Sequence, residues 1–210
     1  MEIRDNRIIA AGELGKAVGI IAAGGVVAFP TETFYGLAAD AANEGAIDQI
    51  FALKGRSFSN PIALIIAELA HLEALTEGIS DTAHKLMAAF WPGPLTLVFR
   101  AAPAVSLRLT AGSGKIGVRI SSHPLAQALA AGLGRPITAT SANRSGHPEC
   151  TTADEVSKQL NSDLLTILDG GPTPGGNGST FLDLSTEPPA MLRQGTISRG
   201  ALITICGKIS

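Results

Sequence analysis

Short apolar runs of strand length alternate along the chain with segments in which apolar residues recur at helical spacing. The runs that predict strands are residues 26–29, 62–67, 95–100, 116–120, 137–140, 165–169, 180–184 and 190–193. Helices are predicted over residues 12–23, from Asn43 to about Leu53, over residues 80–90, from near Pro124, and over residues 152–161. This alternation predicts an α/β fold on one core. Some strands are joined by connections too short for a crossover, so we expect a mixed sheet.

Local signals support several of these elements. Asn43 is a typical N-cap residue, and apolar side chains follow it at helical spacing. Ser80 is a second candidate N-cap, and Pro92 lies just beyond the helix that it begins. Residues 62–67 are apolar without interruption, which is typical of a strand buried on both faces.

The composition describes a chain with ample core material and little charge. Of its 210 residues 45% are hydrophobic, so the chain is not intrinsically disordered, and its length favours one domain over residues 1–210. The net charge is −2 and aromatic residues make up only 4%, which leaves little for base stacking or for neutralising a polyanion. Any cationic site must therefore be local.

Cysteine usage and the N-terminal sequence point to a cytoplasmic protein. Cys150 and Cys206 are far apart and belong to no Cys/His cluster, which argues against a disulfide framework or a zinc site. We see no signal peptide, and the longest apolar stretch, residues 18–29, is shorter than the ~20 residues of a membrane span. We therefore expect no membrane association.

The sequence gives no support for three familiar ligand-binding or catalytic motifs. Residues 112–117 match GxGxxG by letter but lead into a predicted strand, so no helix N-terminus follows to hold a pyrophosphate. The chain has no HExxH zinc motif and no GxSxG nucleophile motif.

Four polar segments are better candidates, and each also has a purely structural explanation. Residues 30–37 follow a predicted strand, where ligands often bind in α/β sheets, but their threonines are also typical of a turn. Lys54-Gly55-Arg56 is suited to clamp an anion, although two cations also complement a helix C-terminus. Residues 138–146 end a strand in small hydroxyl and amide groups, which suit phosphate contacts or an Asx/Ser turn. The glycine-rich residues 170–180 can form an anion-binding nest or a plain connector.

Arg119 is the remaining candidate. It lies between Val118 and Ile120 in a predicted strand, so it points away from the face of its apolar neighbours. It is either a surface arginine on an edge strand or an arginine that binds a carboxylate in a cleft.

Taken in order, these segments resemble the YrdC/TsaC family, the threonylcarbamoyl-AMP synthases of tRNA modification. The resemblance covers roughly residues 12–200 and rests on residues 29–37, 54–56, 60–61, 92–96, 118–120, 123–125, 140–146, 178–180 and 192–195. It departs from the family pattern at Ala38, where a glycine is usual, and at Ser57, where a proline is common. Longer members of the family carry a C-terminal extension domain, for which we expect no room before Ser210.

The resemblance implies a YrdC/RibB-like fold: a twisted mixed sheet with flanking helices around a deep, positively lined cleft. It implies that L-threonine, bicarbonate and ATP, brought with Mg²⁺, are converted to threonylcarbamoyl-AMP and pyrophosphate. A partner transferase complex would pass the threonylcarbamoyl group to tRNA, which this chain would then meet only indirectly. One competing hypothesis is a non-catalytic RNA-binding module that uses the same cleft. Another is a different carbamoyl or nucleotidyl transferase on the same scaffold.

The resemblance also assigns residues to roles. Matches to the catalytic signature around the ATP phosphates are Lys54, Arg56, Ser141 and Asn143. Expected nucleotide contacts are Arg56, Asn60, Lys115, Ser141, Glu149 and Arg193. Expected contacts to L-threonine are Thr33, Arg119, Ala139 and Ser179. No metal ligand is predicted, since Mg²⁺ is expected to be held mostly by the triphosphate.

Overall fold

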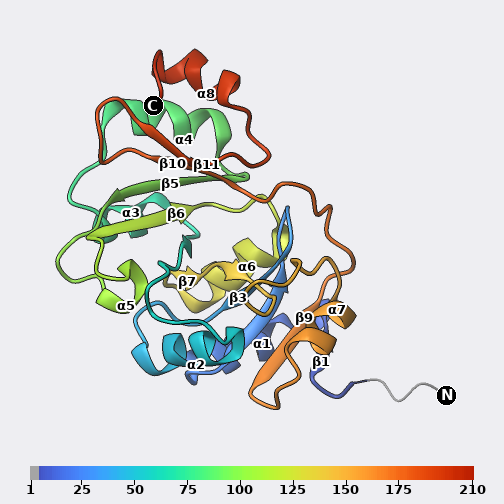
Figure 1. The fold of residues 1–210 in the computed structure, drawn as a ribbon. Helices are drawn as coiled ribbons and strands as arrows, with labels where there is room; N and C mark the ends of the chain where they lie inside the picture. The colour runs from blue at the N-terminus through green and yellow to red at the C-terminus, as the bar shows by residue number, and fades with distance from the viewer. Residues whose placement is uncertain (1–4) are drawn as a thin grey trace.

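The computed structural model describes residues 5–210, whose strands form two sheets that lie one above the other in Figure 1. The first sheet has five strands in the order β1 (Ile8–Ala10), β9 (Leu165–Asp169), β2 (Val26–Pro30), β3 (Tyr35–Ala38) and β8 (Thr140–Ser141). Strand β9 pairs in parallel with both β1 and β2, whereas β3 pairs antiparallel with β2 and β8.

The second sheet has six strands. Their order is β11 (Ala190–Arg193), β10 (Thr180–Asp183), β5 (Leu95–Arg100), β6 (Lys115–Arg119), β4 (Leu64–Ile65) and β7 (Ile137–Thr138). Parallel pairs (β10 with β5, β4 with β6) alternate with antiparallel ones (β10 with β11, β5 with β6, β4 with β7). The expected mixture of parallel and antiparallel pairing is therefore confirmed, while the division into two sheets was not predicted.

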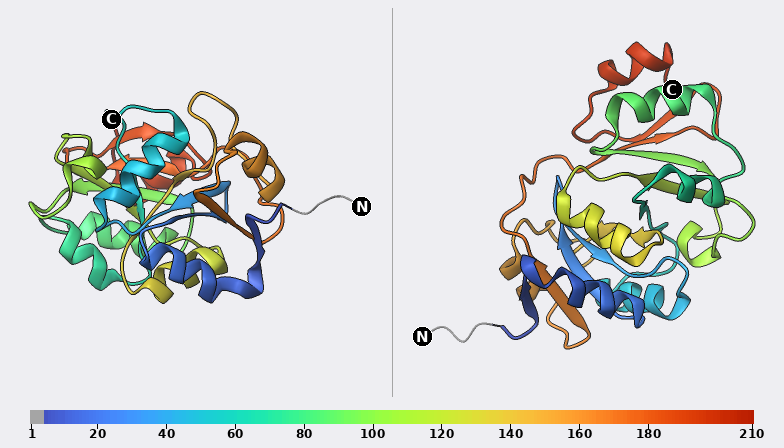
Figure 2. Two further views of the ribbon diagram at one scale, coloured as in Figure 1. Left: turned by 90° about the horizontal axis from the view of Figure 1, so that it is seen from below. Right: turned by 180° about the vertical axis from the view of Figure 1, so that it is seen from behind.

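Helices flank both sheets (Figure 2). They are the 3₁₀ turn η1 (Ala11–Glu13) and the helices α1 (Leu14–Ala22), α2 (Glu44–Lys54), α3 (Leu69–Leu75), α4 (Asp81–Phe90), α5 (Leu107–Thr110), α6 (Pro124–Leu133), α7 (Ala153–Gln159) and α8 (Arg199–Cys206). The two predicted N-caps are confirmed: the side chain of Asn43 accepts a hydrogen bond from the backbone N–H of Ala46 at 3.1 Å, and that of Ser80 accepts one from Ala83 at 3.2 Å. Among residues 5–210, no helix combines the length and the apolar character that a membrane crossing requires.

Two apolar clusters fill the interior. The larger cluster includes residues of both sheets, such as Leu37 of β3 and Val118 of β6. The smaller cluster lies where α1 and α6 pack on each other and on β2, with Ile21 and Leu129 among its fully buried members. Because the larger cluster is shared, the two sheets form one continuous packed unit rather than two separate cores.

The segment from residue 137 to 141 changes sheets, although the apolar pattern predicted one strand over 137–140. Strand β7 pairs with β4 in the six-stranded sheet, and β8 pairs with β3 in the five-stranded sheet. Between them, the backbone N–H of Ala139 donates to the carbonyl of Ala63 at 2.7 Å. The prediction of a single strand is wrong here because hydrogen bonding to two different partners turns the chain at Ala139.

Other differences have similar causes. Residues 62–66 are almost completely buried, as expected for a core strand, but only Leu64–Ile65 pair as β4. The sequence patterns did not predict β1, β3, α3, α5 or α8. Strand β3 was missed because it is only four residues long and was interpreted as part of the polar segment that follows β2.

Candidate active site

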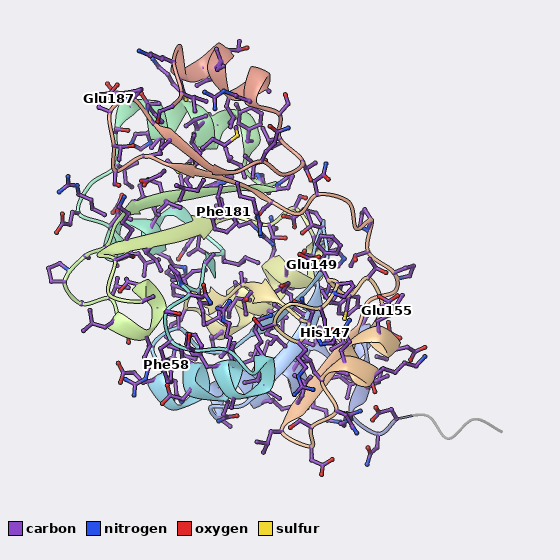
Figure 3. All side chains as sticks on the ribbon, viewed as in Figure 1. Phe58, His147, Glu149, Glu155, Phe181 and Glu187 are labelled. Carbon is purple, nitrogen blue, oxygen red and sulfur yellow. The ribbon has the colours of Figure 1, made fainter. Side chains whose placement is uncertain are left out.

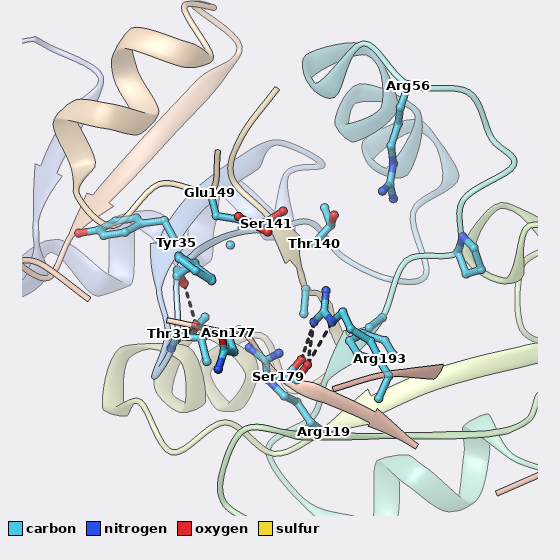
Figure 4. Close-up of a pocket in the computed structure, with 18 residues that line it drawn as sticks. Thr31, Tyr35, Arg56, Arg119, Thr140, Ser141, Glu149, Asn177, Ser179 and Arg193 are labelled. Carbon is cyan, nitrogen blue, oxygen red and sulfur yellow. Dashed lines mark hydrogen bonds between the residues drawn. The ribbon is translucent and has the colours of Figure 1, made fainter. Parts of the chain in front are cut away.

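A cavity of about 290 Å³ lies where the two sheets meet (Figures 3 and 4). Glu149 borders it from the loop before α7, and Phe181 of β10 lines it from the six-stranded sheet. The residues that line it are Thr31, Thr33, Phe34, Tyr35, Gly36, Arg56, Pro61, Ala63, Arg119, Ala139, Thr140, Ser141, Glu149, Asn177, Gly178, Ser179, Phe181 and Arg193. Three of them are arginines and one is an acid, so the cavity is a local cationic site in a chain of net charge −2.

The segment after β2 supplies two hydroxyl groups to this cavity. Thr31 Oγ1 lies 3.1 Å from Thr33 Oγ1 and donates to the carbonyl of Phe34 at 2.7 Å. The backbone N–H of Gly175 donates to the carbonyl of Thr33 at 2.7 Å, which ties the glycine-rich loop to the same segment. These bonds hold the hydroxyls where the strand opens into the cavity.

Arg119 approaches from the last position of β6. Its side chain is buried, and its Nε lies 3.3 Å from Glu32 Oε1 in an ion pair that bridges the two sheets. Burial lowers the pKa of Arg119, while the Glu32 charge opposes that change. Figure 4 shows the guanidinium group beside Ser179 and Asn177.

Arg193 lies beside it at the end of β11. Its guanidinium group stacks 4.5 Å from the Phe181 ring and donates from Nη2 to the carbonyl of Ser179 at 2.9 Å. The Ser179 hydroxyl also accepts from Thr96 Oγ1 at 3.0 Å. Burial lowers the pKa of Arg193, and the positive charge of Arg119 lowers it further. An anion in the cavity would relieve this repulsion between two guanidinium groups.

Lys54 and Arg56 diverge at the end of α2 because Gly55 has φ 61° and ends the helix in the left-handed conformation. Lys54 is buried, and its Nζ donates to the carbonyl of Asn143 at 2.9 Å, to Asn143 Oδ1 at 3.1 Å and to the carbonyl of Ser141. Burial lowers the pKa of Lys54 to about 8, and the neighbouring Arg56 charge acts in the same direction. Lys54 therefore supports the loop that carries Ser141.

Arg56 reaches the cavity from the other side of Gly55. It lies 5.2 Å above the Phe51 ring, and its Nη2 donates to the carbonyl of Asn60 at 3.5 Å. Its Nε is buried and has no hydrogen-bond partner among the described residues. Burial lowers the pKa of Arg56. A guanidinium group with free donors beside an open cavity is suited to bind phosphate or carboxylate in a bidentate manner.

The structure brings together most, but not all, of the predicted site residues. Those that line the cavity are Thr33, Arg56, Arg119, Ala139, Ser141, Glu149, Ser179 and Arg193. Lys54 and Asn143 are not among the lining residues but contact Ser141 directly, since Ser141 Oγ donates to Asn143 Oδ1 at 2.6 Å. They belong to the support of the site rather than to its surface.

Asn60 and Lys115 lie outside this group. The side chain of Asn60 is exposed, and its carbonyl is what contacts Arg56. Lys115 begins β6, four residues and therefore about 13 Å before Arg119, and its Nζ pairs with Asp183 at 2.7 Å. The geometry gives the predicted nucleotide contact of Lys115 no support, because that amine is engaged at the other end of the strand.

Sequence reasoning missed other residues of the cavity wall. Thr31 and Tyr35 belong to the polar segment that was singled out, but neither was assigned a role. Asn177 lies in the glycine-rich loop, where its amide side chain stood out among glycines. The sequence did not predict a role for Phe181, because its position under Arg193 depends on the pairing of β10 with β11.

The chemistry of the lining suits small anionic ligands. Within residues 5–210, no group of three or more His, Cys, Asp or Glu side chains gathers as a metal site would require. The guanidinium groups of Arg56, Arg119 and Arg193 can neutralise carboxylate and phosphate groups, and the surrounding hydroxyls can orient them.

Comparison with known proteins decides the family. Residues 19–195 match the model of the Sua5/YciO/YrdC family, which carries the description "Telomere recombination". The chain belongs to the Sua5/YciO/YrdC family. The chain is 42% identical to a threonylcarbamoyl-AMP synthase of Bacillus subtilis over 198 residues. These residues are 94% of this chain and 57% of the relative. A threonylcarbamoyl-AMP synthase of Vibrio vulnificus is 38% identical over 87% of this chain and 98% of the relative.

Solved structures agree with this assignment. The crystal structure of Pyrococcus abyssi Sua5 complexed with L-threonine superposes with a TM-score of 0.92 at 39% identity, covering 97% of this chain and 62% of that one. Escherichia coli YciO superposes with a TM-score of 0.82 at 26% identity, covering 93% and 97%. The family resemblance and the fold class expected from the sequence are thereby confirmed. The chain spans somewhat more than half the length of the Bacillus and Pyrococcus relatives.

Proposed function

We propose that the protein is an L-threonylcarbamoyladenylate synthase, a nucleotidyltransferase that uses L-threonine, bicarbonate and ATP. The observation that carries this proposal is a single cavity with three guanidinium groups, opened between the two sheets of a Sua5/YciO/YrdC fold. A carboxylate, a carbamate and a triphosphate are all anions, so such a cavity suits both substrates and the transition state that joins them.

In this proposal L-threonine occupies the part of the cavity formed by Thr33, Arg119, Ala139 and Ser179. Arg119 pairs with the amino-acid carboxylate, and the two hydroxyl groups are placed to orient the rest of the substrate. Bicarbonate supplies CO₂ and hydroxide. The neutral amine attacks the CO₂ carbon, so an N–C bond forms as one C–O π bond breaks, and the released amine proton combines with the hydroxide to form water. The product of this step is a carbamate.

A carbamate oxygen then attacks the α-phosphorus of ATP. The new P–O bond forms as the bond to the bridging oxygen breaks, and pyrophosphate leaves with Mg²⁺, which enters as part of the MgATP substrate. We assign Arg56, Ser141 and Arg193 to the phosphates, with Glu149 at the nucleotide and Lys54 and Asn143 behind Ser141. The nucleotide contacts of Asn60 and Lys115 remain predictions from the family resemblance. In the structure, the Asn60 carbonyl accepts from Arg56, and Lys115 pairs with Asp183.

The threonylcarbamoyl adenylate is a reactive mixed anhydride, so a second protein must consume it. We propose that a transferase complex passes its threonylcarbamoyl group to tRNA, and that both proteins act in the cytoplasm. The naming of the Bacillus and Vibrio relatives as threonylcarbamoyl-AMP synthases supports the product on which this step depends.

Product analysis tests the proposal directly. Purified protein is mixed with MgATP, bicarbonate and L-threonine, and pyrophosphate and the adenylate are measured by a coupled assay and by mass spectrometry. Release of pyrophosphate that depends on both threonine and bicarbonate is expected. Binding of tRNA without threonine-dependent pyrophosphate release would instead support the RNA-binding alternative.

Replacing Arg56 tests the assignment at the phosphates. Arg56→Ala is expected to lower kcat/KM for ATP by about 10²–10³-fold, the range seen when one donor to a developing anion is removed. The fold should persist because the guanidinium group packs at the cavity edge and makes one long hydrogen bond within the protein. Arg100→Ala is a matched control, since Arg100 is an exposed arginine at the end of β5. Equal turnover in the two variants would remove Arg56 from the site.

A further inference from the structure

Glu32 is a buried carboxylate beside the cavity to which the reaction above gives no task. Thr31 and Thr33, on either side of it, line the cavity, whereas Glu32 does not. Its side chain is only 11% exposed and points toward the end of β6. Burying a carboxylate lowers the stability of the folded protein unless a partner group pairs with it, so the partners of Glu32 indicate what it does at this position.

The partners of Glu32 all lie at the end of β6. Oε1 is 3.3 Å from Arg119 Nε, and Oε2 accepts a hydrogen bond from the hydroxyl of Ser121, which is completely buried. The Ser121 hydroxyl accepts in turn from the backbone N–H of His123, the N-cap residue of α6. The carboxylate is thus held in place by the start of α6.

The Glu32–Arg119 contact is close but not aligned as a hydrogen bond. Oε1 of Glu32 and Nε of Arg119 are both buried and have no hydrogen-bond partner among the described residues. Arg119 also makes no hydrogen bond through its two terminal nitrogens to any residue from 5 to 210, and it lines the cavity. Arg119 is therefore located by one ion pair at its Nε side, while its terminal nitrogens remain available.

We propose that Glu32 is a positioning residue for the Arg119 guanidinium group and thereby determines affinity for the amino-acid carboxylate. Glu32 lies in the segment that joins β2 and β3 of the five-stranded sheet, and Arg119 is the last residue of β6 in the six-stranded sheet, so the ion pair sets the guanidinium group across the junction. An arginine held at Nε presents its terminal nitrogens to a carboxylate without first losing the freedom of a long side chain. Arg119 does not need Glu32 to keep its charge, because arginine stays protonated at neutral pH. The ion pair therefore acts on the position of the guanidinium group.

This inference rests on the proposed function, and one variant separates the two. Glu32→Gln keeps the size of the side chain and removes its charge. We expect the KM for L-threonine to rise by about 10-fold or more, while the KM for ATP changes by less than about 2-fold, because a misplacement of about 1 Å is enough for such a loss. Calorimetric titration with L-threonine alone should show the same loss of affinity. Glu73→Gln, at an exposed glutamate of α3, is the matched control.

A double-mutant cycle distinguishes positioning from general damage to the fold. If Glu32 acts through Arg119, Glu32→Gln should have little further effect on threonine affinity in an Arg119→Lys background. Should Glu32→Gln fail to fold, Ser121→Ala removes the other support of the carboxylate and should raise the threonine KM selectively, to a smaller extent.

Three results have distinct meanings. A folded Glu32→Gln protein with wild-type threonine affinity overturns the inference and leaves the proposed function intact. An equal loss in the wild-type and Arg119→Lys backgrounds also overturns it, because Glu32 would then act independently of Arg119. A wild-type protein that neither binds L-threonine nor requires it for pyrophosphate release overturns the proposed function itself.

Discussion

The ammonium group of Lys54 is surrounded by protein oxygen atoms rather than by water. It donates to the carbonyl groups of Ser141 and Asn143 and to the Asn143 side chain, and only 3% of the residue is exposed. Lys54→Met fills the same space but removes the donor to the Ser141 and Asn143 carbonyl groups, while Asn143 Oδ1 keeps only its hydrogen bond from Ser141 Oγ. We expect it to lower the free energy of unfolding by about 2–4 kcal/mol at pH 7, the usual cost of orphaned buried polar groups. Urea unfolding followed by circular dichroism measures the loss, and wild-type stability in this variant would exclude a structural role.

The same lysine predicts a pH dependence of stability. Burial lowers its folded-state pKa from 10.5 to about 8, so between these values the unfolded chain binds a proton that the folded protein has released. Stability contributed by this residue must then rise with pH from about 8 to 10.5. The gap between wild type and Lys54→Met in urea midpoint should widen over that window. A constant gap from pH 7 to 10 would mean that Lys54 titrates normally.

At the scale of elements, one side chain joins the two sheets next to the point where β7 ends and β8 begins. Thr138 is completely buried; its hydroxyl donates to the carbonyl of Leu37 and accepts from the N–H of Ala39, both at 2.9 Å. Thr138→Val keeps the shape and removes both bonds, so we expect a loss of about 2 kcal/mol or more in the free energy of unfolding. Thr138→Ser keeps the hydroxyl and should lose less. The hypothesis fails if valine is tolerated as well as serine in chemical denaturation.

Elements with local signals could be predicted from the sequence, and those that depend on distant partners could not. Helices α2 and α4 begin at Asn43 and Ser80 because each cap bonds within its own first turn. Strands β5, β9 and β11 were predicted at the bounds that the structure shows. The break at Ala139 was not predictable, because it requires Ala63 and strand β3 to lie on opposite sides of the chain.

The same distinction applies to the candidate site. Strand alternation alone pointed Arg119 away from its apolar neighbours, and the cavity lies on that side. Lys54 and Arg56 form one sequence motif, yet Gly55 sends Lys54 beneath the Ser141 loop and Arg56 into the cavity. Sequence spacing cannot distinguish these two directions. It also did not predict that Lys115 of β6 pairs with Asp183 of β10, a contact made across the intervening strand β5.

At the scale of the whole molecule, the charges are arranged for small anions rather than for a polyanion. The chain has 16 Lys and Arg against 18 Asp and Glu. Three arginines line one cavity of about 290 Å³, a volume suited to a nucleotide or an amino acid rather than to a folded RNA. Several other cations are paired at the surface, for example Arg108 with Glu44 and Asp48. Little net positive charge is left to release counterions from a nucleic acid.

We therefore expect tRNA to bind weakly and with strong salt dependence. At about 150 mM salt the Kd for an unmodified tRNA should be weaker than about 1 µM, in the range of non-specific electrostatic binding. Fluorescence anisotropy with labelled tRNA over a salt series measures this, with MgATP added as a competitor for the cavity. Residual binding should be insensitive to Arg56→Ala, because that side chain lies at a cavity that tRNA does not need to enter. Nanomolar binding that survives salt and is lost in Arg56→Ala would show that tRNA itself uses the site, and transfer through a released or handed-over adenylate would no longer be required.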